Sequence, residues 1–113
     1  MKTKDPIYQE CIELNEKQGN AQLGLSSSIS WNDDPKRMTF LFSRYKFVAK
    51  MLEGFNEVLE VGCGDAFAAR IVQQHVKKLT ATDFDPVFIE DAKNIMREPC
   101  LLYTSDAADD GLS

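Results

Sequence analysis

The sequence lacks a long hydrophobic run, and it contains little histidine or cysteine. No stretch approaches the roughly 20 apolar residues of a membrane-spanning helix, and the opening segment 1–6 has no apolar core after its lysines. We therefore expect neither a membrane partner nor a secretory signal. The single histidine and the three cysteines are not spaced as metal ligands, so no metal site is predicted. The cysteines are typical of free thiols in a reducing cytoplasm, which is the expected location.

The sequence is also short of positive charge. Its formal net charge is −5, and no cluster of lysine and arginine stands out along the chain. Nucleic acid is therefore not an expected partner. Hydrophobic residues make up 43% of the chain and charged residues 27%, which is ordinary for a globular protein. With 113 residues, the chain provides one small domain at most.

An apolar run that ends in a pair of glycines is the most informative stretch. The run Val58–Val61 suits a buried parallel strand, and it contains the carboxylate of Glu60. Gly62 and Gly64 follow at once, where the backbone can turn sharply and let a ligand approach closely. A helix-compatible stretch, 65–76, comes next. A strand, a glycine turn and a helix in this order predict a nucleotide-type site, with backbone amides and a helix N-terminus facing the ligand.

A second acidic residue lies at the end of the next predicted strand. This strand is the threonine-containing run Lys78–Asp83, and Asp83 lies 21 positions after Gly62. A carboxylate about 20 residues beyond a glycine turn is placed to accept hydrogen bonds from ribose hydroxyls. Taken alone, Asp83 has an alternative explanation as a helix N-cap or turn residue, and the two glycines are better explained as an ordinary tight turn. The order and spacing of the two motifs together favour a ligand site.

The spacing of the glycines argues against a dinucleotide. A dinucleotide site uses Gly-x-Gly-x-x-Gly, and Phe67 occupies the position of the last glycine. Glu60 would repel a pyrophosphate but attract an ammonium group. These residues argue against an oxidoreductase that binds NAD(P), which stays open as an alternative interpretation. A non-catalytic cofactor-binding protein is a further alternative.

The stretch that contains Glu60, Gly62 and Gly64 resembles motif I of the class I S-adenosylmethionine-dependent methyltransferases, an acidic residue followed by Gly-x-Gly-x-Gly. It departs at Ala66, where the family often has a third glycine. The resemblance implies S-adenosyl-L-methionine as the cofactor. It places an acidic residue at the methionine end, the glycine turn against the ligand, a second acid on the ribose and an aromatic ring beside the adenine. The implied cofactor-binding residues are Glu60, Gly62, Cys63, Gly64, Asp83 and Phe84.

The resemblance also implies what the chain does not provide. In this family the residues that bind the acceptor, and any general base, usually come from the fourth strand onward. We therefore assign no catalytic residue, and we expect methyl transfer to an unidentified acceptor, a small molecule or sugar-pathway intermediate. The chain alone is expected to be an inactive fragment that is poorly stable and binds the cofactor weakly or not at all.

An aspartate followed by proline opens three predicted helices. They run from Asp5 to Gly19, from Asp34 to Gly54 and from Asp85 to about Arg97. The stretch 20–30 is rich in glycine and serine and is predicted to be a loop. The helix from Asp34 has apolar residues on two sides, so we expect both to be covered. The sheet is expected to cover one side, and either the N-terminal helix or parts of the protein outside this sequence the other.

The end of the chain is interpreted separately. Residues 100–109 resemble the translation of a transposon-end adapter used in preparing sequencing libraries, which predicts that the native sequence stops near Pro99 and that 100–113 is a non-native tail. The expected fold is α/β. It is the N-terminal part of a Rossmann-like doubly wound parallel sheet (βαβα), preceded by two helices and truncated before the third strand. The expected regions are an N-terminal helix and loop, 1–34, and a partial cofactor-binding domain, 35–99.

Overall fold

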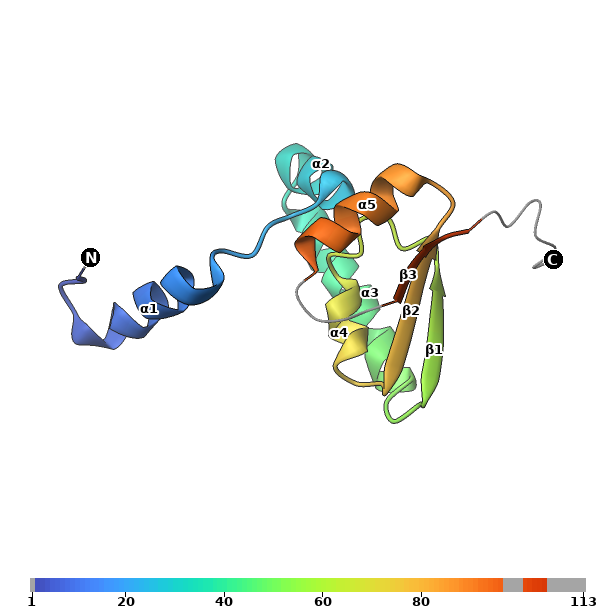
Figure 1. Ribbon diagram of the computed structural model, residues 1–113, viewed down its shortest axis with the longest axis horizontal. Coiled ribbons are helices and arrows are strands. Elements are labelled where there is room, and N and C mark those ends of the chain that lie inside the picture. Colours follow the sequence, from blue (N-terminus) through green and yellow to red (C-terminus); the bar gives the residue numbers. More distant parts are fainter. Residues whose placement is uncertain (1, 97–100, 106–113) are drawn as a thin grey trace.

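The computed structural model describes residues 2–96 and 101–105 and shows an α/β protein with a three-stranded parallel sheet (Figure 1). The strands are β1 (Glu57–Val61), β2 (Lys78–Asp83) and β3 (Leu101–Thr104), and they lie in the order β1-β2-β3. Helices connect the parallel strands, as parallel pairing requires. The expected α/β class and the parallel pairing of the first two strands are confirmed.

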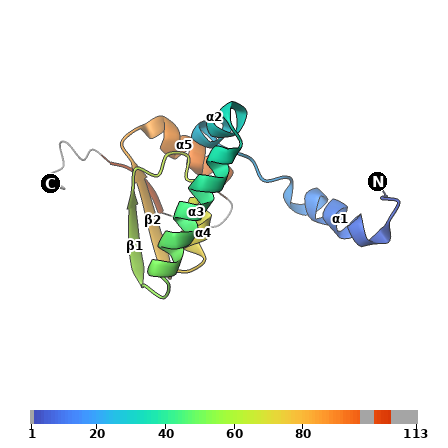
Figure 2. The ribbon, with the colours of Figure 1, turned by 180° about the vertical axis from the view of Figure 1, so that it is seen from behind.

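Most helices lie against one face of this sheet (Figures 1 and 2). A short 3-10 turn, η1, precedes the first helix. None of the described helices is long and apolar enough to cross a membrane. The elements are η1 (Pro6–Tyr8), α1 (Gln9–Gln18), α2 (Leu25–Asp33), α3 (Lys36–Met51), α4 (Ala69–Gln73) and α5 (Pro86–Ile95).

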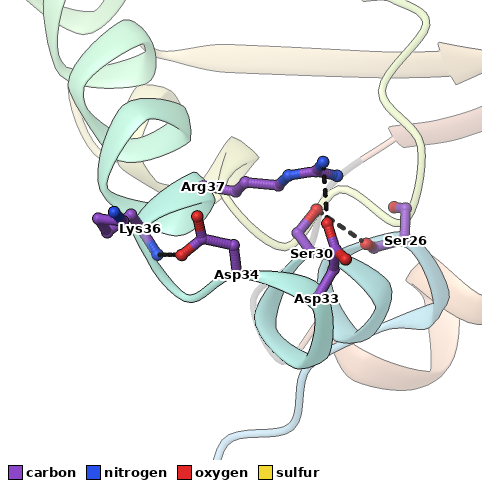
Figure 3. A network of polar contacts seen from close by, with 6 residues as sticks. All are labelled: Ser26, Ser30, Asp33, Asp34, Lys36 and Arg37. Carbon is purple, nitrogen blue, oxygen red and sulfur yellow. Dashed lines mark hydrogen bonds and ion pairs between the residues drawn. The ribbon is translucent and has the colours of Figure 1, made fainter.

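The aspartate-proline pairs cap helical segments as expected. The Asp5 carboxylate accepts a hydrogen bond from the Ile7 amide, and the Asp85 carboxylate accepts one from the Val87 amide. Asp34 follows α2 directly. Its carboxylate accepts a hydrogen bond from the Lys36 amide at the start of α3, as Figure 3 shows. The predicted end of the last helix at Arg97 lies outside the described residues.

The expectation that the sheet stops before a third strand is wrong. β3 pairs with β2 in parallel, with Leu102 opposite Ala81 and Tyr103 opposite Thr82. The Ser105 amide extends the pairing by donating to the Asp83 carbonyl. Apolar and aromatic residues with high β-propensity can pair with the free edge of β2 whatever the origin of their codons. The adapter origin of 100–109 stays a prediction, but 101–105 belong to the sheet.

The N-terminal region also differs from the prediction. α2 occupies much of the stretch expected to be a loop, because contacts with distant residues satisfy its first amides. α1 forms as predicted, with Gly19 following it at a φ of 71°. However, α1 has no buried residue and extends away from the rest of the molecule (Figures 1 and 2). The second apolar side of α3 is therefore not covered by α1.

The core between the helices and the sheet is built mainly from small side chains. Five of its nine buried residues are alanines, which let α3, α4 and α5 approach closely. Each alanine buries little apolar area, so the core contributes modest hydrophobic stabilisation. The buried residues are Ala49, Cys63, Ala66, Ala69, Val72, Leu79, Ala81, Ile89 and Ala92.

The opposite face of the sheet is open. On β1, Val58 and Glu60 are half-buried on the helix side, whereas Leu59 and Val61 are 57% and 64% exposed. Tyr103 of β3 is also exposed on this open side. The described residues thus form one layer of helices on one face of the sheet, and none of their helices covers the other face.

The open sheet face should cause self-association. Replacing Leu59→Thr and Val61→Thr together removes apolar area but keeps β-propensity. We expect the double variant to sediment as smaller species than the parent chain and to bind severalfold less of a hydrophobic dye. Glu57→Gln on the same strand is the control and should change neither measurement. A parent chain that binds no dye, with unchanged sedimentation in the double variant, would contradict this expectation.

Candidate functional site

The two acidic residues predicted from the sequence lie at the same edge of the sheet. Glu60 is opposite Ala81 in the β1–β2 register, so Asp83, two residues further along β2, lies on the same face. The glycine turn follows β1 directly and contacts the end of β2, where the Gly64 amide donates to Asp83 Oδ2 at 2.9 Å. The structure therefore brings together the acidic pair and the turn as the motif spacing predicts.

The turn itself has the conformation that favours glycine. Gly62 has a φ of 78° and Gly64 a φ of 59°, both in the left-handed region. A side chain on Gly62 would meet no other atom, whereas one on Gly64 would press on the Ser26 hydroxyl. Ala66 also has a φ of 59°. The position where the methyltransferase motif often has its third glycine thus adopts a glycine-like backbone here, at the steric cost that alanine carries there.

The backbone amides of the turn point into the protein, not toward a ligand. Gly62 and Cys63 both donate to the Thr82 carbonyl, at 2.8 and 2.9 Å, and Gly64 donates to Asp83. The expectation that amides and a helix N-terminus face the ligand is therefore not met. α4 has only five residues and begins after the turn has closed on itself. The bare Cα of Gly62 is the part of the turn that stays open.

Asp83 stabilises this turn. Its Oδ2 accepts from the Gly64 amide and its Oδ1 from the Asp85 amide, and the side chain is buried. A carboxylate has about four acceptor positions, so two remain for ligand hydroxyls. Asp83 therefore joins the ends of the two strands, and its remaining lone pairs can accept hydrogen bonds from the two hydroxyls of a diol.

Glu60 has a partner on α3. The Tyr45 hydroxyl donates a hydrogen bond to Glu60 Oε2. Burial raises the pKa of the Glu60 carboxyl, and the bond from Tyr45 opposes this rise only partly. Burial is also the main reason why the pKa of Tyr45 is raised, and its hydrogen bond to Glu60 is the second. The phenol therefore keeps its proton. A half-buried carboxylate of this kind gains from a nearby cation.

Asp65 follows the glycine pair directly, and the sequence alone does not indicate its role. It is buried, and its Oδ2 accepts from the Ser27 amide at 2.8 Å and from the Ser27 hydroxyl at 2.6 Å. Its Oδ1 accepts from the Phe67 amide. A side chain on Gly24 would overlap the Asp65 carboxylate. Asp65 thus joins the start of α2 to the glycine turn, and a glycine is needed for that approach.

The two remaining predicted residues lie in contrasting surroundings. The Cys63 side chain is buried in the core, where its thiol donates to the Gly64 carbonyl at 3.4 Å. Any contribution of Cys63 to a ligand site would come from its backbone. Phe84 follows β2 and is 76% exposed, so its ring is available to stack on a planar group.

The cavities do not coincide with the strand ends. A cavity of about 140 Å³ between α2, α3 and the turn is lined by Tyr45, Cys63 and Asp65 among others. It is too small for an adenosyl ligand, since ligand pockets usually measure roughly 300–1,000 Å³. A hollow of about 970 Å³ lies between Phe42, Phe67 and Met96. It contains none of the predicted site residues, so a ligand at the strand ends would lie on the open outer side of Gly62 and Phe84.

Among residues 2–96 and 101–105, no group of three or more His, Cys, Asp and Glu side chains is arranged to hold a metal ion. Searches against protein-family models, curated proteins and solved structures find no significant match.

Replacing Asp65→Asn should loosen α2. The amide side chain can accept from Ser27, but its NH2 group then faces the Phe67 amide, so at least one bond to a charged acceptor is lost. We expect a loss of about 2 kcal/mol in the free energy of unfolding, measured by chemical denaturation. Asp33→Asn is the control, because its exposed ion pair with Arg37, seen in Figure 3, contributes about 0.5 kcal/mol or less. Equal losses in the two variants would contradict the anchoring role.

Ala66→Gly should be nearly neutral. Relief of the left-handed conformation gains about 1–2 kcal/mol, which offsets a lost buried methyl of about 0.8 kcal/mol and the greater freedom of glycine in the unfolded chain, about 0.4–1 kcal/mol. Ala92→Gly in α5 removes a buried methyl without any such relief and should cost about 2 kcal/mol. Thermal melts of both variants test the difference, and similar melting temperatures would refute strain at Ala66.

Proposed function

We propose that the chain is the cofactor-binding part of a class I S-adenosylmethionine-dependent methyltransferase. The observation that carries the proposal is the arrangement at the strand ends. Glu60 and Asp83 lie on one edge of the sheet, on neighbouring parallel strands, with the open left-handed Gly62 between them. The residues fit a ligand with a cation at one end and a diol further along.

The hydrogen bonds of the turn favour this cofactor over a dinucleotide. A pyrophosphate needs free backbone amides at a glycine turn and a helix N-terminus. Here the amides of Gly62, Cys63 and Gly64 already donate to acceptors on β2, and Phe67 replaces the glycine of the dinucleotide motif. S-adenosylmethionine carries no phosphate, so it needs none of these amides.

Four of the six predicted residues then have a role that their position supports. Glu60 would bind the ammonium of the methionine end, directly or through water. Asp83 would accept hydrogen bonds from the ribose hydroxyls with its remaining acceptor positions. The exposed ring of Phe84 would stack beside the adenine, and Gly62 would let the backbone approach the ligand.

The chemistry is methyl transfer by positioning. Bound S-adenosylmethionine would supply an activated methyl group on its sulfonium. The residues of this chain would hold and orient the cofactor. We assign no residue here to acceptor binding or to proton removal, and we propose a small-molecule acceptor.

Ligand titration tests the proposal. Nuclear magnetic resonance of the chain with S-adenosylmethionine, its demethylated product and NAD detects weak binding residue by residue. We expect weak binding of the first two, with shifts at Gly62, Gly64 and Phe84, and none of NAD. Preferential binding of NAD, or shifts confined to the hollow beside Phe42, would contradict it.

Glu60→Gln should weaken cofactor binding and at the same time stabilise the protein. Burial raises the folded-state pKa of Glu60 above its ordinary value of 4.5, so the folded protein binds the proton more tightly than the unfolded chain. Stability therefore falls as pH rises from about 4.5 through the folded-state pKa. The neutral glutamine avoids this loss and should melt at a higher temperature at pH 7, with the gain vanishing below pH 4.

The same substitution removes the charge that would bind the ammonium, so affinity for S-adenosylmethionine should fall about tenfold at pH 7. Glu57→Gln, exposed on the same strand, is the control for both measurements. If Glu60→Gln raised the stability but left the affinity for S-adenosylmethionine unchanged, Glu60 would have a structural role only. Unchanged stability would contradict the effect of burial on its pKa.

A further inference from the structure

α3 has a charge unlike the rest of the protein. It carries five basic residues and no acidic one, in a chain with a formal net charge of −5. The cluster is not evident in the linear sequence because other residues separate the charges. The helix places them together on one element. The basic residues are Lys36, Arg37, Arg44, Lys46 and Lys50.

The outward side of α3 is apolar as well as basic. Phe40, Phe47 and Met51 are 67%, 65% and 64% exposed. Their spacings of seven and four residues place them on one side of the helix, opposite the side of Met38 and Ala49, which are buried. We call these three residues and their flanking basic groups the outward face of α3. Two exposed phenylalanines and a methionine in a row form an uncovered apolar stripe.

α1 has the complementary character. It carries Glu10, Glu13 and Glu16 against a single Lys17. Ile7 in η1 and Leu14 are exposed, and neither η1 nor α1 contains a buried residue. A helix of ten residues is marginally stable in water by itself. α1 therefore needs a surface to pack on, and the outward face of α3 needs a cover.

The two surfaces match in spacing and charge. Ile7 and Leu14 are seven residues apart, as are Phe40 and Phe47, so the two pairs can face one another across packed helices. The acidic residues of α1 would lie beside the basic residues of α3, an arrangement that fixes orientation and favours the pairing over others. We propose that α1 of one copy docks on the outward face of α3 of a second copy, forming a reciprocal dimer.

The path of the chain favours a second copy over the same one. α2 begins beside α5, where the Leu25 amide donates to Asp91 Oδ2 at 2.7 Å. The segment from α1 arrives on this side, whereas α3 lies on the other side of the molecule, toward the viewer in Figure 2. A two-fold dimer lets each copy give one α1 and receive one, which closes the assembly. The proposal does not depend on the identity of the cofactor.

A charge-swap experiment tests the pairing. It uses the full chain with Leu59→Thr and Val61→Thr, so that association through the open sheet face is reduced. Glu10→Lys with Glu13→Lys should weaken the dimer about tenfold in analytical ultracentrifugation, and Arg44→Glu with Lys50→Glu should do the same. In a mixed dimer both contacts pair opposite charges, the swapped α1 with the swapped α3 and the native α1 with the native α3, so mixing the two variants should recover a dimer. The control Glu90→Lys, exposed on α5, should leave the dimer unchanged.

Disulfide trapping distinguishes the two copies. Cys11 lies on the apolar side of α1 and is exposed. With Cys100→Ser, a cysteine is introduced by Phe40→Cys or by Met51→Cys, at the two ends of the stripe. A cross-linked dimer through Cys11 in either variant supports the proposal. An intrachain disulfide, or a monomer at all concentrations, would overturn it. Binding of anionic vesicles or RNA to the full chain that Arg44→Glu with Lys50→Glu abolishes, without any dimer in their absence, would overturn it as well.

Discussion

The hydrogen bonds that close the glycine turn onto β2 are the constraint on which the rest of the site depends. The Thr82 carbonyl and the Asp83 carboxylate accept the amides of three successive turn residues, Gly62, Cys63 and Gly64. This fixes where β1 ends, holds the turn in a left-handed conformation and leaves the bare Cα of Gly62 as its open part. The same bonds use up the donors that a phosphate would need, so the proposed preference for a ligand without phosphate rests on the contacts that shape the turn.

The burial of Glu60 has a different origin, and it matters for both stability and function. The side chain lies on the helix side of β1, where Tyr45 of α3 donates to it. Desolvation raises its pKa and makes its ionised form costly in the folded protein. A group that is unfavourable for folding but ready to pair with a cation is typical of a binding site rather than of a structural ion pair. On the opposite face of the sheet, nothing in the described residues accounts for the exposure of the apolar side chains Leu59 and Val61.

Local sequence rules predicted the elements that depend on local chemistry. The aspartate-proline caps, the glycine turn after β1 and the positions of Glu60 and Asp83 follow from hydrogen-bonding and backbone preferences within a few residues. The rules failed where distant contacts decide. α2 was predicted to be a loop because serine and glycine are poor helix formers, yet Asp65 and Asp91 accept its first amides. The pairing of β3 was missed because residues 101–104 were interpreted by their resemblance to an adapter and not by their β-propensity. The bond from Tyr45 to Glu60 joins a helix to a strand, and spacing along the sequence does not predict it.

The capping of α2 bears on the order in which the chain folds. Its N-terminal amides bond to carboxylates that are 66 and 38 residues away in sequence, and Gly24 must lie directly against one of them. Contacts over such separations form later than local ones, because the entropy of loop closure opposes them. α2 thus leaves the ribosome before β1 and β2 but becomes ordered after them, since the turn that receives it exists only once β1 and β2 have paired.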